Sequence, residues 1–155
     1  MTNHLVQQIQ NCAQVYLANR EHSRLELYHK LIKKGFDSAI IDTVLTQLQA
    51  DNFLSDERFV ENYLRVRISK GYGPLRIEQE LRERGISSTL LSQALNFHDP
   101  QWLTRAQQAW QKRFGQKNLS GDRREQAKQI RFLQYRGFTS TQIKAVLSGS
   151  VSEEN

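Results

Sequence analysis

Basic side chains gather around a tyrosine in the middle of the sequence. The stretch 62–77 contains no Asp or Glu. Its candidate contact residues for a partner are Arg65, Arg67, Lys70, Tyr72 and Arg76. Guanidinium and ammonium groups can neutralise phosphates or bind an acidic protein surface. The composition of this stretch therefore predicts a surface for an anionic partner, but charge alone does not separate nucleic acid from protein.

A second basic cluster lies in the last third of the chain. Residues 101–155 contain ten Lys and Arg against four Asp and Glu, whereas residues 1–61 contain six against eight. The candidate residues for contact with DNA or a filament are Lys112, Arg113, Lys117, Arg123, Arg124 and Lys128. Such polarity suits a protein that lies between a basic and an acidic surface. Trp110 and Phe114 lie beside this cluster, and their four-residue spacing favours a helix core over a binding role.

Catalytic and metal-binding patterns are absent from the sequence. Asp56 and Glu57 are adjacent on a predicted helix, so their side chains diverge and make a poor catalytic pair. The four histidines show no metal-ligand spacing with the single cysteine, Cys12, which falls on an apolar helix face and is expected to be a buried thiol. We therefore expect no enzymatic activity, no cofactor and no metal.

Three segments of the chain align on a glycine. They are LIKKGFDSAIIDTVL at 31–45, LRERGISSTLLSQAL at 81–95 and LQYRGFTSTQIKAVL at 133–147. Each pattern predicts a helix that ends in a basic residue, a glycine in the left-handed conformation, and a second helix. The matching glycines are Gly35, Gly85 and Gly137, and the expected caps of the second helices are Ser38, Ser88 and Ser140.

A further helix precedes each pair, over about residues 5–19, 56–70 and 100–114. The sequence thus predicts an all-α protein of three tandem three-helix, helix-turn-helix-like repeats. The expected boundaries are 1–54, 55–98 and 99–148, followed by a flexible acidic tail over 149–155.

The glycines beside Tyr72 are explained by the same architecture. Gly71 is expected to end one helix, and Gly73 with Pro74 to begin the next, because proline is well tolerated at the first helical position. A Gly-x-Gly pair without a preceding strand is a weak signal for a phosphate-binding loop. Tyr72 is therefore expected to pack at a tight corner between helices, while remaining a candidate for partner contact.

The expected location is the cytoplasm. No apolar run approaches the length of a membrane span, and residues 1–10 lack the pattern of a secretory signal. One cysteine excludes an internal disulfide and fits a reducing compartment. We expect a monomer without membrane contact.

The stretch LSDERFVENYLRVRISKGYGPLRIEQELRERGI, at 54–86, resembles the signature of the bacterial RecX family. Residues 16–36 and 130–143 resemble the first and last units of that family. The resemblance implies an elongated, curved array of three-helix units that binds the filament of the RecA recombinase on DNA. It implies inhibition of RecA, with effects on homologous recombination, DNA repair and the SOS response. It also implies DNA binding, which the excess of basic residues after residue 100 predicts to be non-specific, to single- and double-stranded DNA alike.

Two other functions remain open from the residues alone. A helix-turn-helix transcriptional regulator would use the helices that follow Gly35, Gly85 and Gly137. The first two of these helices contain no Arg or Lys, which major-groove readout usually needs. A passive scaffold with an unrelated partner is the other alternative.

Arg67 and Arg76 lie on no predicted apolar stripe, so reversing their charges is expected to leave the fold intact.

Overall fold

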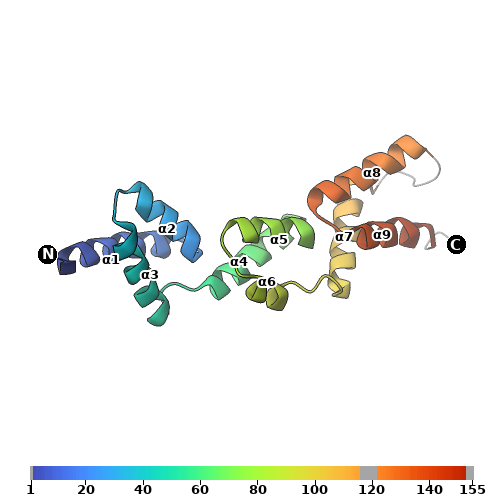
Figure 1. The fold of residues 1–155 in the computed structure, drawn as a ribbon. Helices are drawn as coiled ribbons and strands as arrows, with labels where there is room; N and C mark the ends of the chain where they lie inside the picture. Colours follow the sequence, from blue (N-terminus) through green and yellow to red (C-terminus); the bar gives the residue numbers. More distant parts are fainter. Residues whose placement is uncertain (1, 116–121, 153–155) are drawn as a thin grey trace. The chain divides into compact units, whose positions relative to one another are not determined.

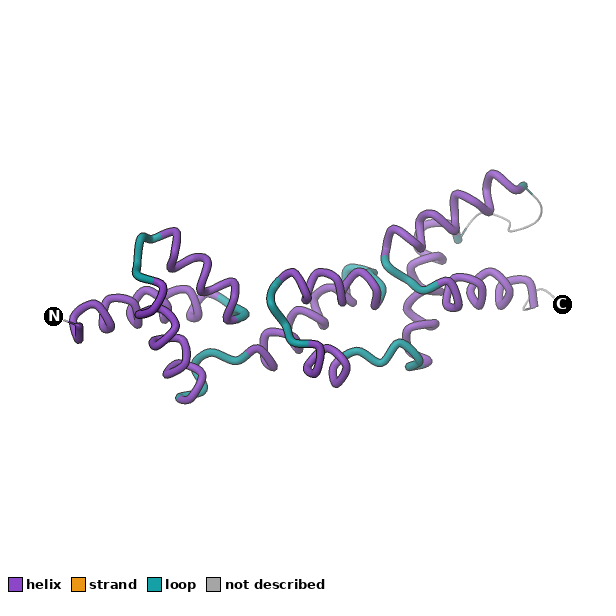
Figure 2. The backbone as a smooth tube through the Cα atoms, viewed as in Figure 1, coloured by secondary structure: helices purple, strands orange, loops and turns teal. Residues whose placement is uncertain are grey.

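The protein is all-α in a computed structural model that describes residues 2–115 and 122–152. Within these residues there are nine helices and no strand, as Figures 1 and 2 show. The helices are α1 (Thr2–Asn19), α2 (Arg24–Lys33), α3 (Ser38–Ala50), α4 (Asp56–Ser69), α5 (Pro74–Glu83), α6 (Ser88–Ala94), α7 (Pro100–Phe114), α8 (Arg123–Arg136) and α9 (Ser140–Ser152). The predicted all-α, three-helix architecture is confirmed.

The repeated glycines have the predicted conformation. Gly35, Gly85 and Gly137 have φ angles of 92°, 79° and 99°, in the left-handed region that favours glycine. Each glycine ends the helix before it and is followed by a backbone turn. Gly71 also has a positive φ, of 87°, and follows the end of α4 as expected.

The helix caps lie one residue before the predicted serines. The Asp37 carboxylate accepts hydrogen bonds from the Ala39 and Ile40 backbone N–H groups at the start of α3. The corresponding hydroxyl groups at the starts of α6 and α9 belong to Ser87 and Thr139. The prediction of Ser38, Ser88 and Ser140 as caps was wrong, because each of these serines is already the first residue of its helix.

Two helix ends also differ from the expectation. The pattern of 81–95 places Ala94 and Leu95 on the apolar face of a helix, but α6 ends at Ala94, whose side chain is exposed. At the other end of the chain, α9 continues through Gly149 to Ser152. The helix therefore enters the stretch for which the sequence predicts a flexible tail, and residues 153–155 lie outside the described part.

Contacts divide the chain into two compact units. The first contains the residues up to 63 together with 81–91, and the second contains 64–80 together with the described residues from 92 onward. The helices α4, α5 and α6 therefore contribute residues to both units. The expected repeat boundaries, by contrast, follow the order of helices along the chain.

The core of the first unit is aliphatic. Its fully buried side chains include Leu27, Leu31 and Ile41, which come from α2 and α3 and pack with α1. Cys12 is half-buried and packs against this core, as its position on the apolar face predicts. The glycine corner of 84–86 packs on α2, because a Cβ added at Gly85 would lie 2.7 Å from the Leu25 Cβ.

The core of the second unit is more aromatic. Helix α7 packs against both α8 and α9. Trp110 and Phe114 on α7 are 8% and 2% exposed, so the prediction that they are core residues is confirmed. The Trp110 indole N–H donates to the Oε1 atom of Gln129, a fully buried side chain on α8.

A backbone joint connects two corners within the second unit. The Gly73 N–H donates to the Arg136 carbonyl at 2.6 Å, and the Leu75 N–H donates to the Gly137 carbonyl at 2.9 Å. A Cβ added at Gly73 would lie 2.5 Å from the Gly137 carbonyl carbon. Glycine is needed here because any side chain would separate the two backbones. The segment 71–75 is thus the corner that the sequence predicts, and it also docks the start of α5 onto the end of α8.

Candidate partner-binding surface

Tyr72 is surrounded by arginines at the corner between α4 and α5. The guanidinium carbons of Arg67, Arg76 and Arg136 lie 3.8, 4.4 and 5.0 Å from the centre of its ring. The negative face of an aromatic ring attracts such cations. We call Arg67, Tyr72, Arg76, Glu80 and Arg136 the Tyr72 cluster.

The charges of the Tyr72 cluster are paired inside the protein. Arg67 donates to both oxygens of Glu80, at 2.9 and 2.6 Å, and the two side chains are 17% and 18% exposed. Arg76 lies 3.5 Å from the same carboxylate. Both arginines stabilise the position of α5 through ion pairs with Glu80 rather than through apolar packing. The absence of these arginines from the apolar stripes is therefore not enough to predict that reversing their charges leaves the fold intact.

Arg76 and Arg136 also join the middle of the chain to α8. The Arg76 Nη1 atom donates to the Tyr135 carbonyl at 3.1 Å, and the guanidinium lies 4.8 Å from the Tyr135 ring centre. The Arg136 Nη1 atom donates to the Lys70 carbonyl at 2.9 Å, at the end of α4. These bonds satisfy carbonyl groups near helix ends that have no partner within their own helix.

A hollow of about 510 Å³ opens beside this joint. It is lined by the end of α4, one face of α7 and the second half of α8, all within the second unit. Its basic lining residues are Lys70, Arg105, Lys112, Arg113 and Arg136, and no acidic residue lines it. We call it the basic hollow. Phe132 supplies an aromatic wall, and Ile68 and Ala109 add apolar surface.

The basic hollow brings together residues from both predicted clusters. Lys70 comes from the stretch around Tyr72, while Lys112 and Arg113 come from the last third of the chain. Arg105 and Arg136 also line it but were not among the predicted contact residues. Arg105 lies about two helical turns before Lys112 and Arg113, and this spacing on one helix is the signal that could have identified it.

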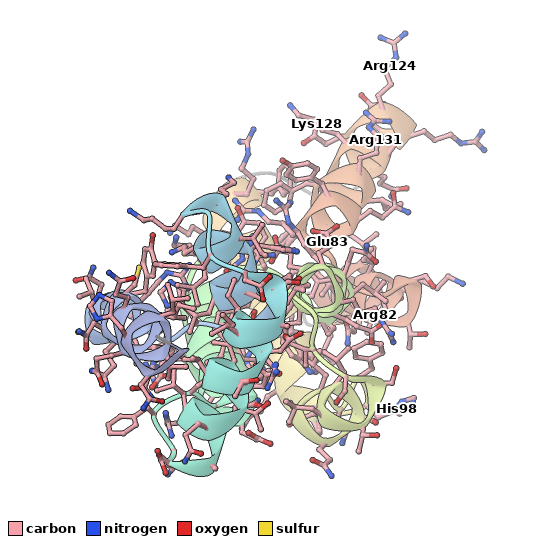
Figure 3. The ribbon with its side chains drawn as sticks, turned by 60° about the vertical axis from the view of Figure 1, so that its left-hand side comes forward. Arg82, Glu83, His98, Arg124, Lys128 and Arg131 are labelled. Carbon is pink, nitrogen blue, oxygen red and sulfur yellow. The ribbon has the colours of Figure 1, made fainter. Side chains whose placement is uncertain are left out.

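The remaining predicted residues lie on open surface. Arg65 is exposed on α4, and Arg123, Arg124 and Lys128 are exposed on α8. Figure 3 shows Arg124, Lys128 and Arg131 projecting from α8. Lys117 lies outside the described residues. The structure thus separates the predicted contact residues into three places, which are the Tyr72 cluster, the basic hollow and the exposed surface of α4 and α8.

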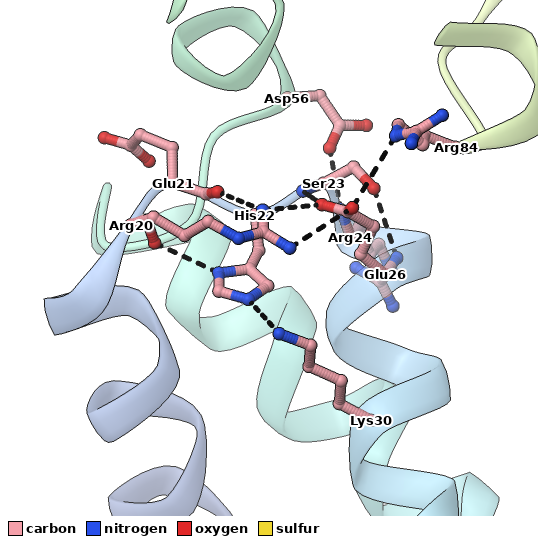
Figure 4. A network of polar contacts seen from close by, with 9 residues as sticks. All are labelled: Arg20, Glu21, His22, Ser23, Arg24, Glu26, Lys30, Asp56 and Arg84. Carbon is pink, nitrogen blue, oxygen red and sulfur yellow. Dashed lines mark hydrogen bonds and ion pairs between the residues drawn. The ribbon is translucent and has the colours of Figure 1, made fainter. Parts of the chain in front are cut away.

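A polar network in the first unit surrounds a buried histidine (Figure 4). His22 is 1% exposed, and its Nδ1 atom lies 3.0 Å from the Arg20 carbonyl. A carbonyl only accepts hydrogen bonds, so Nδ1 carries the proton and Nε2 accepts from Lys30 Nζ at 2.7 Å. Burial lowers the pKa of His22, and the nearby charges of Arg20 and Lys30 lower it further.

The start of α2 anchors the rest of this network. Ser23 and Glu26 form a reciprocal capping box, as their spacing indicates. The Asp56 carboxylate accepts from the Arg24 backbone N–H at 2.8 Å, and burial raises the pKa of Asp56. Arg84, which follows α5, lies 3.8 Å from Glu26 and adds a charge to the same network. The Asp56 carboxylate thus joins the start of α4 to the start of α2.

The described residues contain no cluster of three or more His, Cys, Asp or Glu side chains with a metal-binding arrangement. Over the same residues, every helix is too short or too polar to cross a lipid bilayer. The surfaces best suited to bind a ligand are the basic hollow with Phe132 and the exposed basic residues of α8.

These features define an all-α repeat protein with a cationic surface. Family models for the first, second and third three-helix domains of RecX match residues 11–48, 55–95 and 99–147. The chain therefore belongs to the RecX family.

Individual relatives agree with this assignment. The chain is 37% identical over 146 residues to the regulatory protein RecX of Halorhodospira halophila, covering 94% of this chain and 90% of the relative. It is 40% identical over 141 residues to the regulatory protein RecX of Pseudomonas putida, covering 91% and 90%.

Two crystal structures share the fold. RecX from Lactobacillus salivarius superposes with a TM-score of 0.83 at 20% identity, over 95% of this chain and 97% of that one. A second structure, of a regulatory protein RecX, gives a TM-score of 0.81 at 22% identity, over 94% and 72%.

Proposed function

We propose that this protein inhibits the RecA recombinase by binding the RecA–DNA filament, and so regulates homologous recombination, DNA repair and the SOS response. Membership of a family of regulatory proteins supports this role. The RecA partner comes from the family resemblance, whereas the binding chemistry comes from this chain's own surface. The protein acts by occupying the filament and has no catalytic step.

The observation that carries the proposal is the basic hollow. Five cations line it without an acidic residue, and they come from α7, from α8 and from the residue that follows α4. Like charges this close repel one another, so the site is stabilised when an anionic partner enters. A phosphate backbone and an acidic protein edge both have the required charge, and a RecA–DNA filament contains both kinds of surface.

Binding to DNA is proposed to be non-specific. Helices α3 and α6 contain no Lys or Arg, so they are poorly suited to reading bases in a major groove. Contacts from lysine and arginine to phosphates make affinity fall steeply with salt and depend little on sequence. A thousandfold preference for one short duplex would instead support the transcriptional regulator.

The test is inhibition of RecA ATP hydrolysis on single-stranded DNA. Lys112→Gln with Arg113→Gln removes two charges from the basic hollow. The control is Lys33→Gln with Lys34→Gln, which removes two exposed charges at the C-terminal end of α2. Both pairs lie at the C-terminal ends of helices, so their effects on the helix dipole match.

We expect the first pair to raise the concentration for half-inhibition about tenfold, and the control pair to change it less than twofold. A tenfold change corresponds to about 1.4 kcal/mol, a reasonable loss for two charge contacts. Equal effects of the two pairs would reject the hollow as the contact site. Absence of inhibition by the unaltered protein would reject the proposed function itself.

A further inference from the structure

One face of α8 carries three cations and an aromatic ring in a row. Arg124, Lys128, Arg131 and Tyr135 are separated by four, three and four residues. At 3.6 residues per turn this spacing keeps them within about 60° of arc, over about 16 Å of helix. All four side chains are exposed, and Tyr135 is 71% exposed. We call this row the outer face of α8.

The opposite side of the same helix is buried in the core of the second unit. Gln129 and Leu133 are both fully buried. The outer face therefore cannot turn inward, and its charges stay on the surface.

The side chains of the three cations form no ion pair among the described residues. Among residues 2–115 and 122–152, no carboxylate or side-chain acceptor pairs with the side chains of Arg124, Lys128 or Arg131. This distinguishes them from Arg67 and Arg76, which share the Glu80 carboxylate. Unpaired cations spaced by about one helical turn can each neutralise a phosphate of an extended strand.

Tyr135 is exposed but held in place. The Arg76 guanidinium lies 4.8 Å from the ring centre and also donates to the Tyr135 carbonyl. Arg76 is in turn fixed by Glu80 and by the Tyr72 ring. A ring supported in this way loses little conformational freedom on binding, which lowers the cost of contact with a ligand.

We propose that a single strand of nucleic acid lies along the outer face of α8, with its phosphates at the three cations and one unpaired base stacked on Tyr135. Stacking on aromatic side chains is a common way to bind single strands without sequence preference. A duplex does not offer this contact, because the faces of its bases are covered by neighbouring bases. An acidic protein would match the cations but has no base for the ring.

This inference rests on the DNA-binding part of the proposed function and deepens it. It adds Arg131 and Tyr135 to the contact residues and gives the surface a preference for single-stranded over double-stranded DNA. The preference arises from one ring, so it can be removed without removing the charge.

The experiment measures DNA affinity in the absence of RecA. Fluorescence anisotropy compares labelled oligo-dT with a mixed-sequence duplex of equal length, over a series of salt concentrations. Tyr135→Ala should weaken oligo-dT binding about five- to tenfold and leave duplex binding unchanged. Tyr135→Phe, which keeps the ring, should bind oligo-dT as the unaltered protein does. The control is Phe53→Ala, which removes a 54% exposed aromatic from the first unit and should change neither affinity.

The cations are tested separately from the ring. Affinity for oligo-dT should fall with salt, so the slope of log affinity against log salt is negative. Replacing Arg124, Lys128 and Arg131 together by Gln should make this slope shallower by about 2, since each neutralised phosphate of a single strand contributes about 0.7 to its magnitude. Circular dichroism and melting of every variant establish that α8 remains folded.

Several results would overturn the inference. They are equal losses of oligo-dT and duplex binding on Tyr135→Ala, an equal loss on Tyr135→Phe, and an unchanged salt slope in the triple variant. If the unaltered protein binds neither DNA, the DNA part of the proposed function fails as well. Because RecA inhibition is measured separately through Lys112 and Arg113, failure at α8 leaves that test intact.

Discussion

The Tyr72 cluster and the outer face of α8 are both basic, aromatic parts of the second unit, but their charges meet different groups. Arg67 and Arg76 share one carboxylate and stack on a tyrosine. The cations on the outer face of α8 pair with no side chain of the described residues. The difference shows that basic residues in a sequence can stabilise the fold through ion pairs in one place and remain available to a ligand in another.

The distinction depends on a single acid. Glu80 lies on α5, thirteen residues from Arg67 in sequence, and the corner at Gly71–Pro74 brings the two together. On α8, Asp122 and Glu125 line the same surface hollow as Arg124, Lys128 and Arg131, but none of these three cations forms an ion pair with a carboxylate of the described residues. The predictions below test this contrast, starting with the joint that holds the Tyr72 cluster.

The largest effect is expected from Gly137→Ala. The φ of 99° costs about 1 kcal/mol for an alanine, and the new Cβ would overlap the Arg76 backbone. With the added overpacking, we expect the free energy of unfolding to fall by about 3 kcal/mol, measured by urea denaturation.

Gly35→Ala is the matched control for this variant. Gly35 has nearly the same φ, of 92°, but no atom within 4 Å of an added Cβ. It should cost only about 1 kcal/mol. Equal losses in the two variants would mean that the joint between the corners does not contribute to stability.

Arg67→Glu should have the next largest effect. It places a second carboxylate beside Glu80 at a site less than one-fifth exposed. Breaking a buried pair costs several kcal/mol, and partial exposure reduces this to about 2 kcal/mol. Arg113→Glu is the control, because Arg113 also lies in the last turn of its helix but is exposed. It should cost about 0.5 kcal/mol in the same denaturation assay. Similar losses would erase the contrast between the two clusters.

The pH dependence of stability tests the buried histidine of the first unit. The pKa of His22 is lowered in the folded protein, so the unfolded chain binds a proton first as the pH falls below about 6.5. Protonation would also turn the acceptor of Lys30 into a cation that the charges of Arg20 and Lys30 repel and that of Glu26 attracts. Stability should therefore be full above the unfolded pKa and decrease on acidification, by at most about 1.4 kcal/mol per pH unit.

Denaturant midpoints between pH 5 and 8 measure this effect. His22→Gln can still accept from Lys30 but does not titrate, so its stability should vary less over this range. An identical pH profile in the variant would assign the effect to other groups, such as Glu26, whose pKa is lowered because hydrogen bonds from Arg20 and Ser23 outweigh its burial.

The smallest effect on stability is expected in the basic hollow. Lys70→Gln with Lys112→Gln removes two exposed charges from its lining. We expect a change within about 0.5 kcal/mol, and slight stabilisation at low salt because repulsion between the cations decreases. Melting temperatures at low and high salt provide the measurement. A large loss would show that these lysines, like Arg67, are bound inside the protein.

Local patterns in the sequence determined the helices and the glycine corners between them. The glycine at each corner sets the left-handed turn through backbone sterics alone, and the apolar spacing places Trp110 and Phe114 in the core. These features depend on neighbours within a few residues, which the sequence shows directly. The cap positions were missed by one residue, because serine is acceptable both as a cap and at the first helical position.

The roles of the charged residues were decided only by the tertiary structure. In the sequence, Arg67 and Lys112 look equally suited to bind a partner, and Arg136 looks like a simple helix terminator. Folding places Arg67 against Glu80, and it brings Lys70, Arg105, Lys112 and Arg136 around one hollow. A charge acts on whatever lies within a few ångströms of it, and for these residues those neighbours come from helices far apart in the chain.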